Sequence, residues 1–258
     1  MGPRRADGYH PLRTLMVTLD GLADTVTVTA SRSRRVSCPG IEGRDNLAWT
    51  ALDALEAEVG RPLPTDVVID KRSPARAGLG GGSSDAAAAL VGADRVHGLG
   101  LGNARLERVA ARVGSDVPFF VCGGAQWAEG RGERLRPATA PPFAAVLAKP
   151  DAGLSTGEVY RAFDRLPPPP PDDPSGIVAR PRNDLWPAAL ALAPGLGATA
   201  RALAAAGADA VLLCGSGSCL AGLFPDRERA RAGAQRLHGD GFRAVVTGPA
   251  GPRPPLSA

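Results

Sequence analysis

The most informative segment of this chain is Pro74-Ala75-Arg76-Ala77-Gly78-Leu79-Gly80-Gly81-Gly82-Ser83-Ser84-Asp85. It lies between a β-branched run over 65–71, which predicts a strand, and an alanine-rich run over 83–97, which predicts a helix. Glycine lets bare backbone N–H groups close around an anion, and a helix N-terminus points further N–H groups at the same place. The stretch from Pro74 to Ser84 therefore predicts a cradle for the phosphates of a nucleotide.

Other kinds of glycine-rich loop fit this stretch less well. It lacks the Gly-Lys-Ser/Thr ending of a Walker A loop, and it lacks the spacing and downstream acid of a dinucleotide fingerprint. A flexible Gly/Ser linker is the remaining alternative, but linkers are rarely held between a β-branched strand and a long helix. Ser83 and Ser84 add hydroxyl groups that could cap the helix, bind phosphate or bind a metal ion.

The pattern Pro-x-x-x-Gly-Leu-Gly-Gly-Gly-Ser-Ser-Asp-Ala-Ala, which begins at Pro74, resembles the phosphate loop of the GHMP kinases. Three further segments are similar to the branch of that superfamily that phosphorylates a cytidine diphosphate alcohol: Arg4 to His10, Gly114 to Phe120 and Cys214 to Ser218. The resemblance runs from about Arg4 to Thr247. It implies ATP-dependent phosphorylation of the 2-hydroxyl of 4-diphosphocytidyl-2-C-methyl-D-erythritol, in the non-mevalonate (methylerythritol phosphate) route to isoprenoids.

The same resemblance implies an α+β fold of two domains, with ATP and substrate in the cleft between them. The N-terminal ATP-binding domain is expected over 1–140, with the fold of the second domain of ribosomal protein S5. The C-terminal substrate domain is expected over 141–248, where the order of strands and helix after residue 210 is ferredoxin-like. A flexible Pro/Gly-rich tail is expected over 249–258.

Hydrophobic periodicity and turn residues predict the individual elements. Helices are predicted at 47–59 (capped by Asp45 or Asn46), 83–97, from about Asn103, 183–192, 199–206 and 226–238, and strands or extended pieces at 16–19, 25–30, 67–69, 117–121, 126–128, 143–148, 210–213, 220–224 and 243–247. The proline run from Pro167 to Pro171 predicts a surface loop with polyproline II character. A docking site for a proline-binding partner is the alternative.

Asp116 and Lys71 are the charged residues expected to serve phosphoryl transfer, which needs phosphates held in line and an acceptor hydroxyl relieved of its proton. Asp116 lies alone between small residues and an apolar run, as a carboxylate poised in a cleft would. The resemblance places the family's catalytic base on Asp116, and a helix cap or turn aspartate is the alternative. It places Lys71 on the nucleotide side near the adenine, whereas a solvated strand-end lysine is the simpler interpretation.

Four residues are expected, by resemblance, at the cytidine end of the substrate. Tyr9 would stack on the cytosine ring and His10 would hydrogen-bond its edge, a combination that suits a flat pyrimidine. Thr156 and Tyr160 match the family's threonine and aromatic at i and i+4, which puts both on one helix face. Tyr160 could equally be an ordinary core aromatic. The Gly215–Ser218 turn is expected to support the phosphate site, although by itself it predicts only a hairpin turn.

Composition and charge narrow the partners and the compartment. The net charge is +4 and no arginine cluster is interleaved with aromatics, so no nucleic-acid partner is expected. The four cysteines form no CxxC pair and the three histidines are far apart, so neither a zinc site nor a disulfide framework is expected. The sequence has no signal-peptide core and no apolar run near the roughly 20 residues that span a bilayer, which predicts a cytoplasmic protein without a membrane partner.

The expected ligands are small molecules. ATP is the expected cosubstrate, and Mg²⁺ is expected with it because ATP phosphates need a counter-ion. Ser84 is a candidate ligand for the metal, whose other protein ligands are unknown. The sequence leaves a monomer and a homodimer equally open.

The beginning of the sequence departs from the resembled family. Its members carry a strand with a lysine and an asparagine shortly before the segment that matches Arg4–His10, whereas this sequence starts at Met1-Gly2-Pro3. We therefore expect that strand and its lysine to be missing here and the chain as written to be a poor kinase. Two alternative functions stay open: another small-alcohol kinase, such as a homoserine kinase, which the Tyr9-His10 and Thr156/Tyr160 set disfavours, and an inactive nucleotide-binding homologue.

Overall fold

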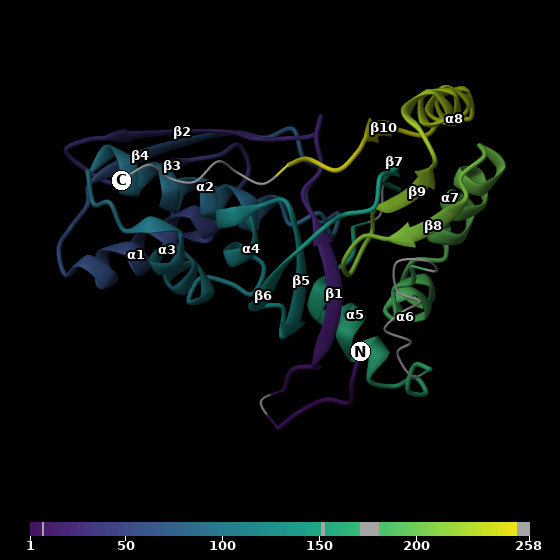
Figure 1. Cartoon of the computed structure of the whole chain (residues 1–258), viewed down its shortest axis with the longest axis horizontal. Helices are drawn as coiled ribbons and strands as arrows, with labels where there is room; N and C mark the ends of the chain where they lie inside the picture. Colours follow the sequence, from purple (N-terminus) through teal and green to yellow (C-terminus); the bar gives the residue numbers. More distant parts are fainter. Residues whose placement is uncertain (7, 151–152, 171–180, 252–258) are drawn as a thin grey trace.

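The computed structural model of the chain describes residues 1–258 except for 7, 151–152, 171–180 and 252–258. Its helices and strands gather in two groups, one from residues 12–138 and the other from residues 144–247 (Figure 1). Strands β1 (Leu12–Val17) and β5 (Ala125–Gly130) belong to the first group and lie on its side toward the second. The predicted combination of helices and strands in an α+β fold is confirmed.

The first group alternates short strands with helices around two sheets. Its remaining elements are β2 (Thr25–Ala30), β3 (Arg35–Ser37), η1 (Gly43–Asp45), α1 (Leu47–Val59), β4 (Thr65–Asp70), α2 (Gly81–Val96), α3 (Gly102–Ala111), α4 (Val117–Cys122) and β6 (Arg134–Ala138). One sheet has the order β2-β4-β3, with β2 antiparallel and β3 parallel to β4. The other has the order β1-β5-β6 and is antiparallel throughout.

Helix α1 begins and ends where the sequence predicts. The Asn46 side chain accepts a hydrogen bond from the backbone N–H of Ala48 at 3.0 Å, which satisfies one of the unpaired donors of the first turn. The helix ends at Gly60, whose φ of 70° is a left-handed conformation that glycine adopts without a steric penalty. Leu52 and Leu55 are fully buried on its inner face.

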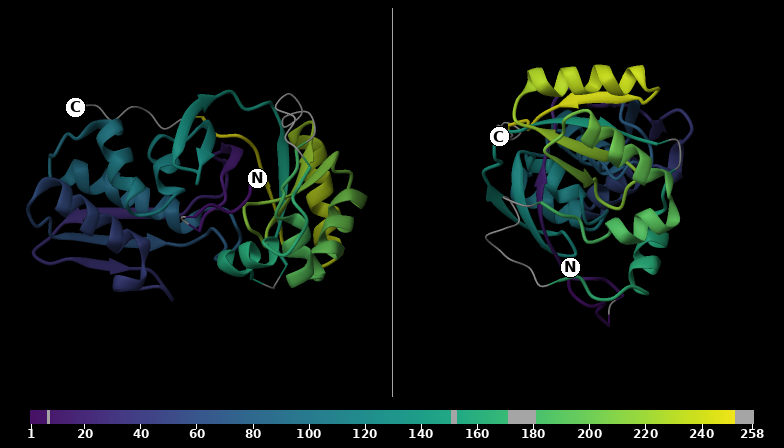
Figure 2. Two further views of the ribbon diagram at one scale, coloured as in Figure 1. Left: turned by 90° about the horizontal axis from the view of Figure 1, so that it is seen from below. Right: turned by 90° about the vertical axis from the view of Figure 1, so that its right-hand side faces the viewer.

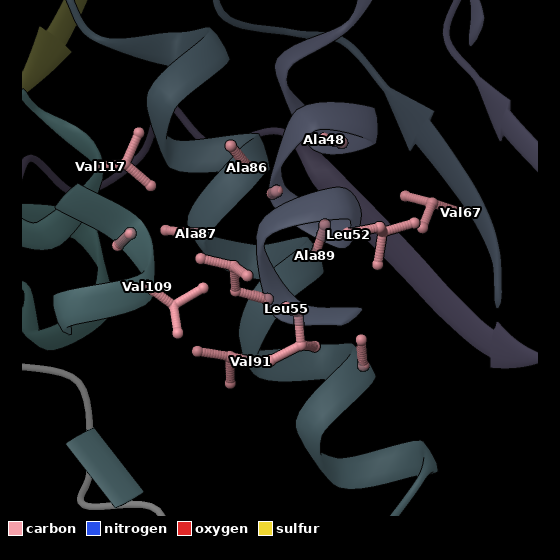
Figure 3. Close-up of a cluster of buried hydrophobic side chains, with 14 of the residues drawn as sticks. Ala48, Leu52, Leu55, Val67, Ala86, Ala87, Ala89, Val91, Val109 and Val117 are labelled. Atoms are coloured by element: carbon pink, nitrogen blue, oxygen red, sulfur yellow. The ribbon is translucent and has the colours of Figure 1, made fainter. Parts of the chain in front are cut away.

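Helix α2 runs through the first hydrophobic core (Figure 3). Its inner face consists mainly of small side chains, and these lie against residues of α1, β4, α3 and α4: Ala86, Ala87, Ala89 and Val91 on α2, with Leu52, Leu55, Val67, Val109 and Val117 around them. Because alanine adds little volume, the neighbouring elements can pack closely against this helix. The core therefore fixes the start of α2, and with it the end of the glycine-rich loop.

The second group is an antiparallel sheet covered by helices. Its elements are β7 (Ala144–Ala148), α5 (Thr156–Phe163), α6 (Trp186–Leu192), α7 (Gly195–Ala205), β8 (Ala210–Leu213), β9 (Leu220–Phe224), α8 (Arg227–Gly239) and β10 (Ala244–Thr247). The sheet order is β10-β7-β9-β8, and α7 and α8 cover one face of it (Figure 2). The connectivity from β7 to β10 is that of a ferredoxin-like fold, which confirms the prediction for this half.

Several predicted elements need correction. Residues 117–121, predicted as extended, form most of helix α4, because Pro118 sits at the start of the helix, where its missing N–H leaves no bond unmade. The strand predicted at 16–19 ends at Val17, and Leu19 instead forms an isolated bridge with Pro249. Strands β3 and β6 were not predicted, since each is short and carries polar residues.

Some sequence predictions fall at or beyond the edge of what the structure describes. Residues 167–170 of the proline run lie in neither helix nor strand, and Pro171 lies outside the described residues. Ala250 N donates to Thr18 O at 2.8 Å, while residues 252–258 of the predicted tail are outside the description. The domain limits at 140/141 and 248/249 stay predictions. None of the described helices combines the length and the apolar character needed to cross a membrane.

Gly92 provides a test of the contact between α2 and β2. A Cβ added at this position would lie 2.5 Å from Cγ2 and 2.7 Å from Cβ of Val28. Alanine is normally the better helix former by about 1 kcal/mol, but overpacking of this kind costs about 1–3 kcal/mol. We expect Gly92→Ala to lower the free energy of unfolding, measured by urea denaturation.

The matched control is Gly239→Ala at the end of α8, where an added Cβ meets no atom within 4 Å. This variant should be as stable as the wild type or slightly more stable. If Gly92→Ala behaves like Gly239→Ala, the packing of α2 against Val28 is looser than described.

Candidate active site

The glycine-rich loop crosses from the end of β4 to the start of α2. Within the loop, the side chain of Ala77 is buried, whereas Ala75 and Arg76 are exposed. Gly80 directly precedes α2 and accepts a hydrogen bond from Ser84 N at 2.8 Å. The N–H groups of residues 81–83 therefore have no partner within the helix, because the first turn lacks preceding carbonyls. Such a helix N-terminus is suited to bind phosphate.

Two glycines in this loop are required by their surroundings. Gly80 has a φ of 69°, and a Cβ there would lie 2.7 Å from Cε2 of Phe120. Gly78 has a φ of 73°, and a Cβ there would collide with the carbonyl oxygen of Cys214 and lie 2.8 Å from Gly217 N. Any larger residue would need both a strained backbone and a displaced neighbour. Glycine at these positions therefore permits close approach, and a flexible linker would have no need of it.

The turn between β8 and β9 is the neighbour that Gly78 touches. Cys219 N donates to Ala77 O at 3.0 Å, and Ser218 N donates to Arg76 O at 3.4 Å. The turn thus binds the backbone of the glycine-rich loop directly, and it comes from the other half of the chain. The structure places the Gly215–Ser218 motif beside the loop, as the sequence-based prediction of a supporting role requires.

A cavity of about 330 Å³ opens beside this contact. Its walls come from both halves of the chain: Arg76, Gly78, Leu154, Ser155, Thr156 and Gly217. A second cavity of about 290 Å³ is lined by Pro74 and Leu79 of the loop and by Lys149, which directly follows β7. Thr156 Oγ1 lies 2.9 Å from Ser216 Oγ, so the start of α5 is tied to the same turn. The loop therefore borders two cavities and is held in place by the second group of elements.

Asp116 is the residue directly before α4. Its side chain makes no capping hydrogen bond, which argues against the alternative that it serves as a helix cap. Asp116 is an exposed residue, although nearby protein atoms displace part of the water around its carboxylate. This loss of water raises the pKa of Asp116 above its ordinary value of 3.8. No other described residue forms a hydrogen bond or an ion pair with this carboxylate, which leaves it open to a ligand.

Tyr160, on α5, lies within electrostatic reach of Asp116. Burial raises the pKa of Tyr160 above its ordinary value, and the negative charge of Asp116 raises it further. The tyrosine ring lies 5.9 Å from the ring of His10 between centroids, with the planes tilted by 31°. The structure thus brings together Asp116, Tyr160 and His10, which are far apart in the sequence.

His10 is buried and both nitrogens of its ring have protein partners. Nδ1 lies 2.9 Å from Gly2 O, and Nε2 lies 2.7 Å from Oδ1 of Asp164 at the end of α5. The ring also packs edge to face on Phe163 at 5.2 Å. These contacts orient the imidazole firmly, and a hydrogen bond from it to a bound base would have to replace one of them.

Tyr9 is half exposed, with a relative accessibility of 50%. The guanidinium carbon of Arg131 lies 4.9 Å from the centroid of its ring. Arg131 belongs to the turn between β5 and β6, and a Cβ added at the next residue, Gly132, would lie 3.7 Å from Oδ1 of Asp116. This turn therefore links the aromatic side of the site to Asp116, and nothing in the sequence singled out Arg131.

Lys71 is not a solvated strand-end residue. Its Nζ donates to Asp24 Oδ2 at 2.6 Å and to Asp85 Oδ2 at 2.9 Å, and both carboxylates are buried. Burial opposes the charge on Lys71, but the two hydrogen bonds outweigh it and raise the pKa of Lys71. No local pattern pointed to Asp24, which is 47 residues from Lys71, or to Asp164, which is 154 residues from His10.

The described residues contain no group of three or more His, Cys, Asp or Glu side chains that could hold a metal ion. Mg²⁺ is compatible with such a site, because it is often bound by one or two protein oxygens together with substrate phosphates. Ser84 offers a hydroxyl oxygen in the first turn of α2, where it donates to Gly81 O at 2.8 Å. A metal there would depend mainly on the nucleotide for its ligands.

The contact at Gly78 can be tested by adding one methyl group. We expect Gly78→Ala to separate the loop from the β8–β9 turn, because the new Cβ would occupy the place of the Cys214 carbonyl oxygen. The unfolding temperature should fall, and the rate of proteolysis in the loop should rise. Gly82→Ala is the control, since a Cβ there has only Leu47 Cδ1 at 3.6 Å, an ordinary contact. Equal stability of the two variants would count against the described contact.

Family comparisons agree with this geometry. Residues 46–124 match the GHMP kinases N terminal domain, and residues 178–243 match the GHMP kinases C terminal domain. The first match spans the glycine-rich loop and Asp116, and the second spans the β8–β9 turn. The two-domain GHMP kinase fold expected from the sequence is thereby confirmed.

Curated relatives share one description. The 4-diphosphocytidyl-2-C-methyl-D-erythritol kinase of Anaeromyxobacter dehalogenans (strain 2CP-C) is 42% identical over 258 residues, which cover 93% of this chain and 81% of the relative. The enzyme of the same description from Geobacter metallireducens is 41% identical over 248 residues, which cover 91% and 88%. Identity at this level over most of both chains extends well beyond the short motifs.

Two solved structures match this chain, one in fold alone and one in both fold and sequence. A homoserine kinase from Cytophaga hutchinsonii matches with a TM-score of 0.72 over 93% of this chain and 90% of its own, but at 18% identity it shows the fold alone. A crystal structure of 4-(cytidine 5'-diphospho)-2C-methyl-D-erythritol kinase matches with a TM-score of 0.82 at 36% identity, over 97% of this chain and 94% of its own. Together with the relatives, this match shows that the chain belongs to the 4-diphosphocytidyl-2-C-methyl-D-erythritol kinase family of GHMP kinases.

Proposed function

We propose that this chain transfers the γ-phosphoryl group of ATP to the 2-hydroxyl of 4-diphosphocytidyl-2-C-methyl-D-erythritol, as a step of the non-mevalonate route to isoprenoids. The observation that carries the proposal is the Asp116 carboxylate, which has no hydrogen-bond partner among the described residues and lies within electrostatic reach of Tyr160, the neighbour of His10. The names of the relatives support the identity of the alcohol. The cavity between the glycine-rich loop and Thr156 supports a ligand bound beside the loop.

Asp116 acts in this proposal as the general base. The hydroxyl oxygen attacks the γ-phosphorus, the bond from that phosphorus to the oxygen of ADP breaks, and the hydroxyl proton passes to the Asp116 carboxylate. Partial loss of water raises the pKa of Asp116, which brings it closer to the pKa of the hydroxyl group that gives up its proton. The lack of a hydrogen-bond partner among the described residues leaves the carboxylate oxygens available for that proton.

The loop from Pro74 to Ser84 binds the ATP phosphates in this proposal. Backbone N–H groups at the start of α2 would face the phosphate oxygens, and the helix dipole favours negative charge there. Lys71 binds Asp24 and Asp85 and thereby holds the two ends of the loop, so its contribution to nucleotide binding is indirect. Mg²⁺ would be held by the phosphates and by Ser84, where it offsets phosphate charge.

Tyr9, His10, Thr156 and Tyr160 form the cytidine side of the proposed site. Tyr9 is half exposed, and Tyr160 lies near both His10 and Asp116, so a base stacked on Tyr160 would keep its alcohol tail near the carboxylate. His10 is oriented by Asp164. Thr156 is exposed at the start of α5 and borders the cavity beside the loop.

A coupled assay of ADP release tests the proposal. The purified chain should turn over ATP with 4-diphosphocytidyl-2-C-methyl-D-erythritol and should not do so with homoserine or mevalonate. Phosphorus NMR of the product should show a new monophosphate ester on the alcohol. ATP turnover with homoserine alone would favour the other small-alcohol kinase, and ATP binding without any turnover would favour an inactive homologue.

Asp116→Asn should abolish phosphoryl transfer while ATP binding stays close to that of the wild type. The amide cannot accept the hydroxyl proton, and loss of a general base typically costs about 10²–10⁴-fold in rate. The kinetic measurement is kcat, and the binding measurement is titration with ATP. Near-normal turnover by a folded Asp116→Asn chain would remove Asp116 from the mechanism.

The pH dependence of kcat/KM is a second test of Asp116 as the general base. Activity requires the ionised carboxylate, so kcat/KM should fall as the pH drops through the pKa of Asp116 in the free enzyme. Because burial raises that pKa, the fall should occur above pH 3.8. A plateau that continues down to pH 3.8 in a folded chain would contradict the assignment.

Tyr160→Ala should raise the KM for the cytidine substrate and leave the KM for ATP nearly unchanged. Stacking of one base on an aromatic ring is worth roughly 1–3 kcal/mol by analogy with single-strand binders. Tyr160→Phe keeps the ring and is the matched control, with a much smaller expected change. If Tyr160→Ala weakens both substrates equally, the ring serves the core of the second group and not the base.

A further inference from the structure

Asp24 is the most fully hydrogen-bonded carboxylate in the described part of the chain. It directly precedes β2, and its side chain is 2% exposed. Oδ2 accepts from Lys71 Nζ at 2.6 Å and from Ser73 Oγ at 2.5 Å, and Oδ1 accepts from Arg72 N at 2.6 Å and Ser73 N at 2.7 Å. Burial alone would raise the pKa of Asp24, but these hydrogen bonds outweigh it and lower the pKa to about 2.

All of these donors belong to the three residues that lead into the glycine-rich loop. Lys71, Arg72 and Ser73 follow β4 and precede Pro74. The donors of Lys71 and Ser73 are partly buried, and a donor there that lost its acceptor would be left without a full replacement from water, which is costly. Asp24 therefore fixes the point at which the loop leaves the sheet.

Lys71 extends this arrangement to the far end of the loop. Its second partner, Asp85, lies in the first turns of α2. A Cβ added at Gly81 would lie 2.5 Å from Ser73 Oγ and 3.2 Å from Lys71 Nζ, so the cluster sits directly under the start of the helix. The residues before the loop and the first turns of α2 after it are thus held by the same three charged groups, Asp24, Lys71 and Asp85.

The two carboxylates of this cluster are not equivalent. Asp85 Oδ1 is buried and has no hydrogen-bond partner among the described residues. Burial raises the pKa of Asp85, Lys71 lowers it, and the charge of Asp24 adds to the rise. With one ammonium between two carboxylates, Asp24 is the fully bonded anion and Asp85 the weaker partner. Loss of Asp24 should therefore do more damage than loss of the charge on Asp85.

We propose that Asp24 is a positioning residue for nucleotide binding, because it holds both ends of the glycine-rich loop through Lys71 and the Arg72–Ser73 backbone. This inference rests on the proposed role of the loop in binding ATP. Asp24 itself touches no substrate in this scheme. Since Asp116, Tyr9 and Tyr160 stand on other elements, the affinity for the cytidine alcohol should not depend on Asp24.

The test compares Asp24→Asn with Asp70→Asn in the full chain. Asp70 pairs in register with Thr25, the neighbour of Asp24, but its side chain is 67% exposed. Its ion pair with Arg72 is long, at 3.7 Å between Oδ2 and Nε. Asp24→Asn should raise the Kd and KM for ATP roughly tenfold or more, as expected when a buried charge loses its hydrogen bonds. The KM for the cytidine alcohol should stay within about twofold, and Asp70→Asn should match the wild type in every constant.

If Asp24→Asn does not fold, Ser73→Ala keeps the proposal testable, and a folded Ser73→Ala chain with the wild-type Kd for ATP would overturn it. Ser73→Ala removes one hydrogen bond to Asp24 and should raise the Kd for ATP by about two- to fivefold. Asp85→Asn should have a smaller effect than Asp24→Asn. Where Asp24→Asn folds, the double variant with Ser73→Ala should be less impaired than the product of the two single effects, because both act through the same contact.

Direct ATP titration separates the two proposals. A wild-type chain that binds ATP but phosphorylates no alcohol would overturn the proposed function and leave the ATP affinities of the variants as a valid test of Asp24. An Asp24→Asn chain that is folded and keeps wild-type ATP affinity would overturn the inference, and so would an equal rise in KM for both substrates. A wild-type chain that binds no ATP overturns both.

Discussion

The contact between the glycine-rich loop and the β8–β9 turn is the constraint on which the candidate site depends. Each half has its own large hydrophobic core, and a small third cluster of Ala77, Leu147 and Cys219 lies where the two halves meet. At Gly78 the two halves meet with no room for a side chain, and Cys219 N donates to Ala77 O across the joint. This joint sets the position of the start of α2 relative to Thr156 and the rest of α5, and the cavity beside the loop is a consequence of it.

The charged residues around the loop differ in role because they differ in environment. Asp24 is buried among donors that lower its pKa, so it stays ionised and bound over the whole physiological range. Asp116 is partly desolvated without a donor, which raises its pKa and leaves it able to exchange a proton with a ligand. One carboxylate therefore suits a structural anchor and the other suits a proton acceptor, although their residue type is the same.

The sequence predicted what depends on local pattern and missed what depends on distant contacts. The cap at Asn46, the helix after the glycines and the ferredoxin-like order of the second half follow from periodicity, turn residues and connectivity. The apolar run at 117–121 was assigned as extended because its β-branched and aromatic residues outweighed the signal of Pro118 as a helix start. Asp24, Arg131 and Asp164 act on residues remote in sequence, so no local pattern could reveal them.

The division of the site between the two halves bears on how the alcohol is chosen. His10 comes from the start of the chain but packs on Phe163 and hydrogen-bonds Asp164, both at the end of α5. The loop and Asp116, in contrast, belong to the first group of elements. The homoserine kinase structure shares this fold at 18% identity, so the fold alone does not select a substrate. On the proposed function, phosphoryl transfer is the task of the first group, and discrimination falls to the few side chains around α5 and Tyr9 that can meet a pyrimidine ring.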